Sequence, residues 1–496
     1  MPSILALDQG TTGSTALVVH QDGTVLGRGY RELPQHFPRP GWVEHDPRDI
    51  LEVTLVAARD AMAAAKEHPE GIGITNQRET VVVWDRRTLE PVGRAIVWQD
   101  RRTSERCLAL RDAGLAPLLA ERTGLVPDPY FSATKLEWLL NDPTVRARAH
   151  RGELAAGTVD SWLIACLTGG RVGATDHTNA SRTLLYALER RDWDPELLAI
   201  FGVPDRLLPD VAPSSGVLGE ADAIHLGFPL PIAGVAGDQQ AALFGQGCCT
   251  RGSAKNTYGT GAFLLVHAGE RRPRPAAGLL ATAACGTRGE PAYAVEGSVF
   301  VAGAAVQWLR DGLGLIARAA ETEALARSVP DTAGVHFVPA FVGLGSPHWE
   351  PEARGTITGI TRGTTRAHLA RAALEAIAFS TAELLDAMTA DGASVTTLRV
   401  DGGAAANDWL MQFQADVLGI PVERPDMVET TALGAAGLAG MALGMWRSPE
   451  DFLAGRRFAR FEPAMGRGER SGRRAEWDRA VGTALLWARG THILGP

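Results

Sequence analysis

Short apolar runs, separated by turns of Gly, Thr and Ser, recur along this chain of 496 residues. The first pair of runs, residues 4–7 and 16–19, has the length of two strands and flanks one such turn. The same strand–turn–strand pattern returns at residues 253–266, and a strand followed by two glycines covers residues 398–403. These glycine-rich turns predict two β-hairpins and one strand-to-helix turn.

Between and after the hairpins, strand-like and helix-like segments alternate. A helix is expected from Pro47 to about residue 66, with Asp46 as its N-terminal cap. Further strands are expected over residues 24–30, 71–75, 81–84, 96–102 and 229–236. Further helices are expected over residues 108–139 with an interruption at 124–130, and over 158–167, 241–245, 409–418 and from 430 onward. This alternation predicts an α/β fold.

The pattern restarts near Gly247, which divides the chain into two parts. A chain of 496 residues is too long for one hydrophobic core. We therefore expect two domains of related fold, residues 1–247 and 248–496, around one cleft. Residues 176–183 and 456–474 are rich in polar side chains, and we interpret them as a loop and a solvated tail segment.

The composition is that of an ordinary soluble globular chain, with 45% hydrophobic and 21% charged residues. A net charge of −8 gives no general attraction to nucleic acid or to an acidic membrane. The five cysteines have no metal-site spacing, which favours reduced thiols in a cytoplasmic protein. The chain opens without a basic-then-apolar leader, and its apolar runs stay below the ~18 residues of a membrane span, so we expect no membrane insertion.

Several classes of enzyme are excluded by the motifs that the sequence lacks. A P-loop places Gly directly before its Lys, whereas Lys66, Lys135 and Lys255 each follow another residue. The His-Arg-Asp loop of protein kinases and the Gly-x-Ser-x-Gly nucleophile elbow are also missing. Residues 312–317 formally fit a dinucleotide fingerprint, but they follow a helix-like segment rather than a strand, so they carry little weight.

The turn of the first hairpin has the chemistry of a phosphate-binding loop. Gly10 and Gly13 can adopt positive φ and let a bound group approach the backbone. The hydroxyls and amides of Thr11 and Thr12 suit phosphate oxygens, and Asp8 suits Mg²⁺ bound through water. The same residues also fit an ordinary Gly/Thr hairpin with an Asp at its shoulder, and the motif alone does not decide between the two.

Asp238 is an isolated acid at the end of an apolar strand. A carboxylate in that place can accept the proton of a substrate hydroxyl as the hydroxyl attacks a phosphoryl group. Asp is also favoured as the N-terminal cap of a helix, and on this residue alone the cap is the preferred interpretation.

Arg78 and Glu79 form an adjacent pair after another predicted strand. Arg donates in a fixed fork and Glu only accepts, so together they suit a small molecule with neighbouring hydroxyls. The alternative is a surface ion pair worth ~0–1 kcal/mol. Trp98 and Phe263 suit the wall of a small carbon chain, although an aromatic side chain at a strand end more often belongs to the core.

Seven segments occur in an order that is far more specific than any single motif. They are Leu7-Asp-Gln-Gly-Thr-Thr12, Ile74-Thr-Asn-Gln-Arg-Glu-Thr80, Val97-Trp-Gln-Asp-Arg-Arg102, Tyr130-Phe-Ser-Ala-Thr-Lys-Leu136, Gly237-Asp-Gln-Gln-Ala-Ala242, Ala254-Lys-Asn-Thr-Tyr-Gly-Thr-Gly261 and Val400-Asp-Gly-Gly403 with Asn407. In these segments the chain resembles the FGGY carbohydrate kinases, and the resemblance runs from the first hairpin to about Trp446.

The resemblance implies two related actin/hexokinase-like (ribonuclease H-like) ATPase domains flanking a central cleft. It implies that ATP, with Mg²⁺, phosphorylates glycerol to sn-glycerol 3-phosphate, the entry step of glycerol catabolism, with Asp238 as general base. By match to the family motifs, the polyol would be held by Arg78, Glu79, Trp98, Tyr130, Asp238, Gln239 and Phe263. The nucleotide would be held by Thr11, Thr12, Gly13, Thr15, Thr260, Gly303, Gln307, Gly403 and Asn407. The metal would be supported by Asp8 and Asp238.

Two departures from the family pattern change what is expected. Family members often carry Ser and Arg where this chain has Gly13 and Thr15, so its phosphate grip lacks an arginine. Pro229 replaces the Arg of members that fructose 1,6-bisphosphate inhibits, so we expect no such inhibition here.

Two other functions remain open at this point. One is a kinase for another small polyol or sugar, of the xylulose or erythritol type. The other is an actin-like ATPase that changes conformation without a small substrate, because one fold hosts several functions. Family members are often dimers or tetramers, so a homodimer or homotetramer is expected, and phosphorylation of His225 or another histidine is left open.

Overall fold

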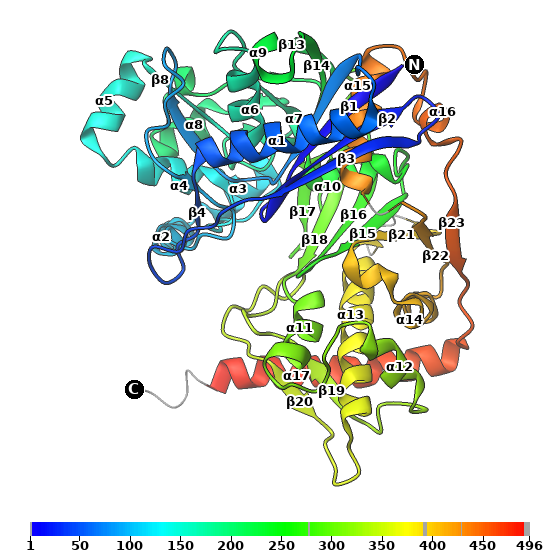
Figure 1. The fold of residues 1–496 in the computed structure, drawn as a ribbon. Helices are drawn as coiled ribbons and strands as arrows, with labels where there is room; N and C mark the ends of the chain where they lie inside the picture. Colours follow the sequence, from blue (N-terminus) through cyan, green and yellow to red (C-terminus); the bar gives the residue numbers. More distant parts are fainter. Residues whose placement is uncertain (1, 276–277, 390–393, 428, 491–496) are drawn as a thin grey trace.

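The computed structural model describes residues 2–275, 278–389, 394–427 and 429–490. Two large sheets organise the chain, one in the order β13-β14-β5-β1-β2-β3 and the other in the order β17-β18-β16-β15-β21-β22-β23. In Figure 1 the first sheet lies in the upper part of the molecule and the second lies below it. The α/β fold predicted from the sequence is confirmed.

The strands have the following bounds. The first sheet contains β1 Ser3–Gln9, β2 Gly13–His20, β3 Val25–Glu32, β5 Gly71–Asn76, β13 Ser215–Ala221 and β14 Leu230–Gly237. The second contains β15 Ala254–Tyr258, β16 Ala262–Gly269, β17 Leu280–Ala283, β18 Tyr293–Val299, β21 Leu398–Asp401, β22 Val422–Pro425 and β23 Phe458–Phe461. Small two-stranded sheets use β4 Glu44–His45, β6 Val82–Asp85, β7 Ala95–Ile96, β8 Leu154–Gly157, β9 Ala174–Asp176, β10 Tyr186–Ala187, β11 Asp192–Trp193, β12 Asp210–Ala212, β19 His336–Val338 and β20 Thr356–Thr358.

The helices surround these sheets. Those before residue 247 are α1 Pro47–Ala65, α2 Ser104–Asp112, α3 Ala116–Thr123, α4 Ser132–Leu139, α5 Pro143–Arg151, α6 Val159–Leu167, α7 His177–Ala180, α8 Pro195–Phe201, α9 Ala223–Leu226 and α10 Asp238–Gly245. Those after it are α11 Gly303–Asp311, α12 Glu321–Arg327, α13 Arg366–Thr389, α14 Asp408–Leu418, α15 Thr430–Ala442, α16 Pro449–Leu453 and α17 Arg467–Gly490. None of the helices in the described ranges is both long and apolar enough to cross a bilayer.

The two large sheets share one pattern of strand pairing. β1 pairs antiparallel with β2 and parallel with β5, which pairs parallel with β14. β15 pairs antiparallel with β16 and parallel with β21, which pairs parallel with β22. In each sheet the carboxyl ends of parallel strands therefore meet at one edge, and the turn of the hairpin lies at that edge. Edges of this kind are where α/β proteins bind their ligands.

The continuous apolar run of β1 reflects burial on both faces of the first sheet. Its residues from Ile4 to Leu7 are fully buried. Helix α1 packs on β2 and β3, and α15 packs on β1, β5 and β14, so both faces of β1 need apolar side chains. As predicted, α1 begins at Pro47 with Asp46 as its cap, whose carboxylate accepts from the Arg48 N–H at 2.9 Å.

Helix α15 comes from the second half of the sequence but packs against the first sheet and α10. Its small residues allow this approach, as the sequence pattern predicts. A Cβ added at Gly434 would lie 1.9 Å from the Ala241 carbonyl oxygen of α10, so only glycine fits there. This contact ties the helix that begins at Asp238 to the second half of the chain.

Three predictions of local structure before residue 247 are wrong. The helix expected without a break over residues 108–123 is interrupted between α2 and α3, where Gly114 has φ 73. The strand expected over residues 96–102 ends at Ile96, because Asp100 turns the chain by accepting from the Val43 N–H at 2.7 Å and the Arg102 N–H at 2.9 Å. The loop expected over residues 176–183 contains the short helix α7, whose N-terminal amides donate to the Asp176 carboxylate.

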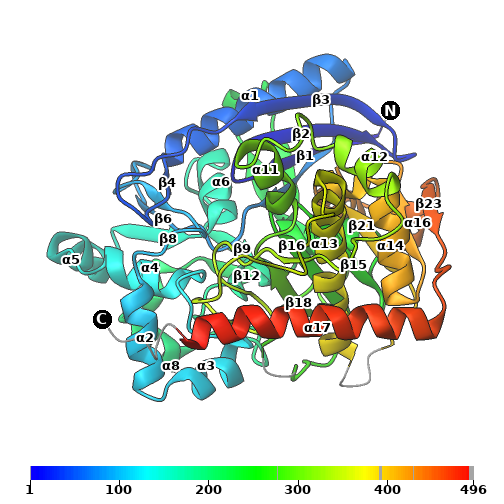
Figure 2. The same ribbon diagram turned by 90° about the horizontal axis from the view of Figure 1, so that it is seen from below.

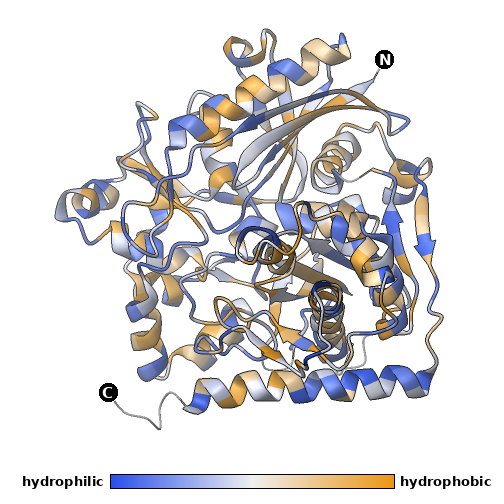
Figure 3. Cartoon of the chain, turned by 60° about the horizontal axis from the view of Figure 1, so that its bottom comes forward, coloured by the Kyte–Doolittle hydropathy of each residue, from blue (hydrophilic) through white to orange (hydrophobic). Residues whose placement is uncertain are grey.

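The stretch expected as a solvated tail, residues 456–474, has no fully buried residue, but it is not a tail. This stretch contains β23, which joins the second sheet, and the start of α17. Three of its arginines form ion pairs: Arg460 with Glu423 at 2.7 Å, Arg473 with Glu375 at 3.6 Å, and Arg474 with Asp386. Figure 2 shows α17 along the outer side of the second half, where it contacts α13 and α14. Figure 3 shows polar residues in its first part and apolar residues nearer its end.

Candidate active site

The candidate residues meet at the edge where β1, β5 and β14 end. Asp8 lies in β1, Arg78 follows β5, and Asp238 follows β14. The Nε atom of Arg78 lies 3.2 Å from Oδ1 of Asp238. Asp8 and Asp238 are close enough for their carboxylates to repel each other. The structure thus brings the first hairpin and Asp238 to one place.

Arg78 is the centre of a buried hydrogen-bond network. Its two terminal nitrogens donate to the two oxygens of Glu296 at 2.7 and 3.0 Å, which is a bidentate pair. They also donate to Oε1 of Gln240 at 3.2 Å and to the Tyr130 hydroxyl at 3.3 Å. The Arg78 side chain is only 2% exposed, so these bonds are shielded from water.

Glu79 is held by a second buried arginine, Arg182. Arg182 donates to Oε1 of Glu79 at 2.7 Å and to Oε1 of Glu296 at 3.0 Å. The backbone of Glu79 has φ 62, a left-handed turn that is uncommon outside glycine. The interpretation of Arg78 and Glu79 as a surface ion pair is wrong, because both side chains are buried.

The pKa values of the two carboxylates of this network shift in opposite directions, because burial prevails at Glu79 and the arginines prevail at Glu296. Burial raises the pKa of Glu79, although Arg78 and Arg182 act against it. Burial would also raise the pKa of Glu296, but Arg182 and Arg78 overcome it and lower that pKa to about 2. Glu296 is therefore an anion that two guanidinium groups share.

One carboxylate oxygen of Asp238 is held by hydrogen bonds, while its side chain remains accessible to solvent. Its Oδ1 atom accepts from the Gln239 backbone N–H at 2.7 Å as well as facing Arg78. Its side chain is 30% exposed, whereas that of Glu296 is fully buried. Asp238 is the first residue of α10 and Gly237 is the cap, so the interpretation of Asp238 as the helix cap is wrong.

Asp8 lies where negative charge accumulates. Burial, together with smaller contributions from the negative charges of Asp238 and Glu429, raises the pKa of Asp8 to about 7. Groups of three or more potential metal ligands do not occur among the described residues. Mg²⁺ needs few carboxylates, because it keeps several of its own waters. Carboxylates that repel one another beside a phosphate-type hairpin fit such an ion.

Lys255 connects the two halves of the molecule at this point. It lies in β15, and its Nζ atom donates to Oε1 of Gln239 at 2.5 Å and to the Thr257 hydroxyl at 2.8 Å. Burial lowers its pKa to about 8, although Asp401 and Asp238 act against the shift. Gln239 therefore receives its partner from the second sheet.

The aromatic candidates occupy different surroundings. The rings of Trp98 and Tyr130 meet edge to face with centroids 5.6 Å apart. The indole N–H of Trp98 donates to the Thr11 hydroxyl at 2.9 Å, which joins this wall to the first hairpin. Phe263 is half-buried and packs against an apolar cluster that includes Leu243 and Cys248.

Each hairpin turn is closed by a backbone hydrogen bond between two of its glycines. The Gly10 N–H donates to the Gly13 carbonyl at 2.9 Å, and the Gly259 N–H donates to the Gly261 carbonyl at 2.8 Å. Gly10 and Gly13 do not use the positive φ that glycine allows, because neither is among the glycines with left-handed backbone. Glycine is needed at Gly13 for space, since a Cβ there would lie 2.5 Å from the Arg31 carbonyl oxygen.

The remaining residues of the first hairpin stay close to its turn. Thr12 is exposed, and its carbonyl accepts from the Leu33 N–H at 2.9 Å. Thr15 lies opposite Asp8 in the β1–β2 pair and is half-buried. The hairpin therefore presents threonine hydroxyls and backbone amides beside the carboxylate of Asp8.

Helix α11 is tied to the second hairpin turn. The Gly303 N–H donates to the Gly259 carbonyl at 3.0 Å, and the Ala302 N–H donates to the Thr260 carbonyl at 2.8 Å. A Cβ at Gly303 would lie 2.5 Å from the Gly259 carbonyl oxygen. Helix α11 therefore begins beside the turn that contains Thr260. Gln307 lies one turn further along this helix, and its side chain is exposed.

The strand-to-helix turn after β21 completes the second half. Gly402 has φ 86, and a Cβ there would lie 2.3 Å from the Tyr258 carbonyl oxygen. Gly403, which follows it, is exposed. Asn407 caps α14 by accepting from the Leu410 N–H at 2.9 Å.

The sequence predictions missed four charged residues that complete the site: Arg182, Lys255, Glu296 and Glu429. Glu296 and Lys255 each stand alone among mostly uncharged residues of a strand, and a charged side chain in such a strand needs a buried partner. A single charged residue in an otherwise uncharged strand is the pattern from which Glu296 and Lys255 could have been predicted. Arg182 and Glu429 lie in polar stretches that look like many others.

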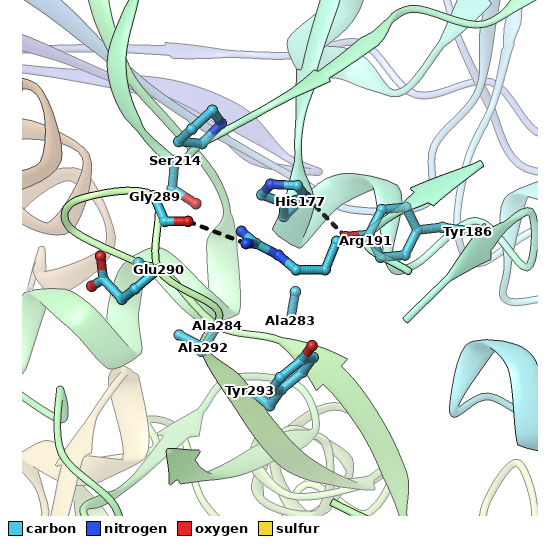
Figure 4. Close-up of a pocket in the computed structure, with 12 residues that line it drawn as sticks. His177, Tyr186, Arg191, Ser214, Ala283, Ala284, Gly289, Glu290, Ala292 and Tyr293 are labelled. Atoms are coloured by element: carbon cyan, nitrogen blue, oxygen red, sulfur yellow. Dashed lines mark hydrogen bonds between the residues drawn. The ribbon is translucent and has the colours of Figure 1, made fainter. Parts of the chain in front are cut away.

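A small cavity lies nearby, where α7 and β10 meet the β17–β18 hairpin (Figure 4). Its volume is about 10 Å³, enough for one water. Arg191 points across it and donates to the Gly289 carbonyl at 3.1 Å, and His177 bonds to the Tyr186 hydroxyl at 2.8 Å. It contains none of the candidate residues and is separate from the candidate site.

Comparison with known proteins agrees with this arrangement. The model of the FGGY family of carbohydrate kinases, N-terminal domain, matches residues 3–245, and the model of its C-terminal domain matches residues 254–443. A glycerol kinase of Acidovorax ebreus (strain TPSY) is 55% identical over 496 residues, covering 98% of this chain and 100% of that protein. A glycerol kinase of Leptothrix cholodnii is 56% identical over 491 residues, covering 97% and 99%.

Solved structures show the same fold. The crystal structure of Plasmodium falciparum glycerol kinase with ADP superposes with a TM-score of 0.92 at 36% identity, covering 98% of each chain. A ligand-bound xylulose kinase from Lactobacillus acidophilus superposes with a TM-score of 0.86 at 21% identity, covering 100% of this chain and 98% of the other. At that lower identity the second match speaks for the fold alone.

Proposed function

Because the chain belongs to the FGGY family of carbohydrate kinases, we propose that it transfers the terminal phosphoryl group of ATP to glycerol. The products are sn-glycerol 3-phosphate and ADP. The observation that carries this proposal is the similarity to glycerol kinases over nearly the whole chain. The buried network around Arg78 and the accessible carboxylate of Asp238 suit this reaction.

We assign the general base to Asp238. Its Oδ1 atom is fixed by Arg78 and by the Gln239 N–H, so we assign the proton of the attacking hydroxyl to Oδ2. A carboxylate held in one orientation removes that proton as the hydroxyl oxygen approaches phosphorus. Positioning and charge neutralisation then supply the rest of the catalysis, as is usual in phosphoryl transfer.

The polyol is assigned to the groups around Asp238. Arg78 donates, Glu79 accepts, and Gln239 and Tyr130 do both, so hydroxyls on adjacent carbons find complementary partners. Trp98 and Phe263 are assigned to the carbon chain. Because Arg78 and Glu79 are almost fully screened from water, their hydrogen bonds to a hydroxyl would gain strength.

ATP and Mg²⁺ are assigned to the hairpins. We assign the binding of the phosphates to Thr11, Thr12, Gly13, Thr15 and Thr260. We assign the binding of the rest of the nucleotide to Gly303, Gln307, Gly403 and Asn407. Asp8 and Asp238 would hold Mg²⁺, which when bound neutralises phosphate charge. The mutual repulsion of these carboxylates with Glu429 supports that assignment, because a cation relieves it.

Several finer assignments belong to the same proposal. We divide the chain into domains 1–247 and 248–496 and propose a cytoplasmic homodimer or homotetramer without a nucleic-acid partner. We also propose that fructose 1,6-bisphosphate does not inhibit it. The exposed residue Pro229 has no positively charged group that could bind a sugar phosphate. Turnover that falls when this bisphosphate is added would contradict the last point.

A substrate panel tests the proposed function. ADP formation is measured with ATP and Mg²⁺ in the presence of glycerol, erythritol, xylulose or no acceptor. The proposal expects the highest kcat/KM with glycerol. Preference for xylulose or erythritol would indicate another kinase of the family, and ADP formation that is independent of every acceptor would indicate an actin-like ATPase.

A further inference from the structure

Glu296 lies in the second sheet, but its side chain binds two arginines of the first half of the chain. It lies in the middle of β18, within the segment matched by the C-terminal family model. Its carboxylate nevertheless pairs with Arg78 at 2.7 Å and with Arg182 at 3.0 Å, both in the segment matched by the N-terminal model. All three side chains are between 0% and 2% exposed.

The two oxygens of Glu296 fix the plane of the Arg78 guanidinium. Oε2 accepts from one terminal nitrogen and Oε1 from the other, which leaves Nε to face Asp238 and one nitrogen to reach the Tyr130 hydroxyl. A fork held at both tips keeps little rotational freedom. The backbone at Gly237 makes room for it, since a Cβ there would lie 2.7 Å from Arg78 Cγ.

We propose that Glu296 is a positioning residue for the polyol, which holds Arg78 and, through Arg182, Glu79 in the orientation that binds the substrate. The inference rests on the proposed function. It adds that the second half of the chain, which carries the β15–β16 hairpin, also sets the affinity of the polyol site in the first half.

The geometry shows why Arg78 needs this partner. Glu79 lies 3.7 Å from Arg78 Nε and already accepts from Arg182, so it is poorly placed to replace Glu296. Without Glu296, the accessible carboxylate nearest to Arg78 is Asp238 at 3.2 Å. Arg78 would turn its fork onto Asp238 and occupy the carboxylate that the reaction requires.

The substitution Glu296→Gln tests the inference, because it keeps the shape and removes the charge. We expect the KM for glycerol to rise at least about tenfold while the KM for ATP stays within about twofold. Glu296→Asp retains the charge, so it should recover part of the affinity for glycerol.

Glu375 provides a matched control. It is also a buried glutamate shared by two arginines, Arg371 at 2.9 Å and Arg473 at 3.6 Å, but it lies in α13 away from the polyol residues. Glu375→Gln should lower the melting temperature without a selective change in the KM for glycerol. Equal effects of the two substitutions on both KM values, or no effect of Glu296→Gln, would overturn the inference.

Hydrogen exchange provides a readout that does not depend on turnover. Glu296→Gln should speed amide exchange over residues 77–80, the loop that carries Arg78, more than Glu375→Gln does. Unchanged exchange there would overturn the inference even if turnover fell. A wild-type protein that does not phosphorylate glycerol would contradict the proposed function, while the exchange result would still decide whether Glu296 positions this loop.

Discussion

The two halves of the site differ in how far they are assembled before any ligand binds. The polyol half consists of Arg78, Glu79, Tyr130, Asp238 and Gln239, and the nucleotide half is represented by Thr12, Thr260, Gln307 and Gly403. In the polyol half, charged groups are buried and bonded to one another across the two sheets. In the nucleotide half these four residues are exposed, and of the other five assigned to it only Gly13 is buried.

This difference follows from what each half has to recognise. A small neutral triol brings no charge and few atoms, so its binding depends on hydrogen-bonding groups that are already in place. A nucleotide with Mg²⁺ brings its own charge and many atoms, so exposed amides and hydroxyls are sufficient to hold it. Substitutions in the polyol half should therefore affect glycerol selectively, and those in the nucleotide half should affect ATP selectively.

Loss of the base should have the largest effect. Asp238→Asn keeps the size of the side chain but removes the proton acceptor, so kcat should fall about 10³-fold. ATP binding, measured by calorimetry, should persist. The exposed carboxylate of Asp311 provides the control, since Asp311→Asn should leave kcat unchanged. Unchanged turnover in Asp238→Asn would exclude its role as base.

The next effect should come from the fork of Arg78. Arg78→Lys keeps the charge but cannot hold Glu296, Tyr130 and the polyol together, so the KM for glycerol should rise about 30-fold or more. The KM for ATP should change little. Arg371→Lys, at a buried arginine outside the site, serves as the control. A larger rise in the KM for ATP than in the KM for glycerol would contradict the assignment of Arg78 to the polyol half.

A smaller effect is expected in the nucleotide half. Gln307→Ala removes one exposed polar side chain from α11, so the KM for ATP should rise about three- to tenfold with the KM for glycerol unchanged. Arg310→Ala, on the same helix, should change neither constant. If Gln307→Ala weakened glycerol instead, the assignment of α11 to the nucleotide would be wrong.

The smallest effect concerns Lys255, which joins the two halves. Its pKa is lowered from 10.5 to about 8 mainly by burial, so between these values the unfolded chain binds more protons than the folded one. The contribution of Lys255 to stability therefore rises with pH across that interval. Relative to Lys255→Met, the wild-type melting temperature should rise by about one to three degrees from pH 8 to pH 10. Parallel melting curves would contradict this.

The sequence predicts the framework better than the contacts within the site. Apolar runs such as residues 4–7 and 16–19 suffice for the first hairpin, because a strand buried on both faces requires them. The strand expected over residues 96–102 fails because Asp100 binds the distant Val43 N–H. The sequence allows positive φ at Gly10 but does not require it, and the hairpin turn closes without it through the Gly10 N–H and the Gly13 carbonyl.

Three residues of the site were not predicted from the sequence for the same reason. Glu296, Arg182 and Lys255 act on residues that lie far away in the sequence, so their roles appear only when the two sheets meet. Asp238 and Arg78, by contrast, follow strands that end at one edge of one sheet, and this position can be inferred from strand order. Sequence patterns therefore predict the groups that line an edge better than the groups that support them.

ATP turnover by the wild-type protein, with and without glycerol, tests the central claim most directly. Phosphorus NMR of the reaction with ATP and Mg²⁺ identifies the product as well as its rate of formation. The account predicts sn-glycerol 3-phosphate and ADP in equal amounts, and little ATP consumption when glycerol is omitted. Release of inorganic phosphate at the same rate with and without glycerol would contradict it.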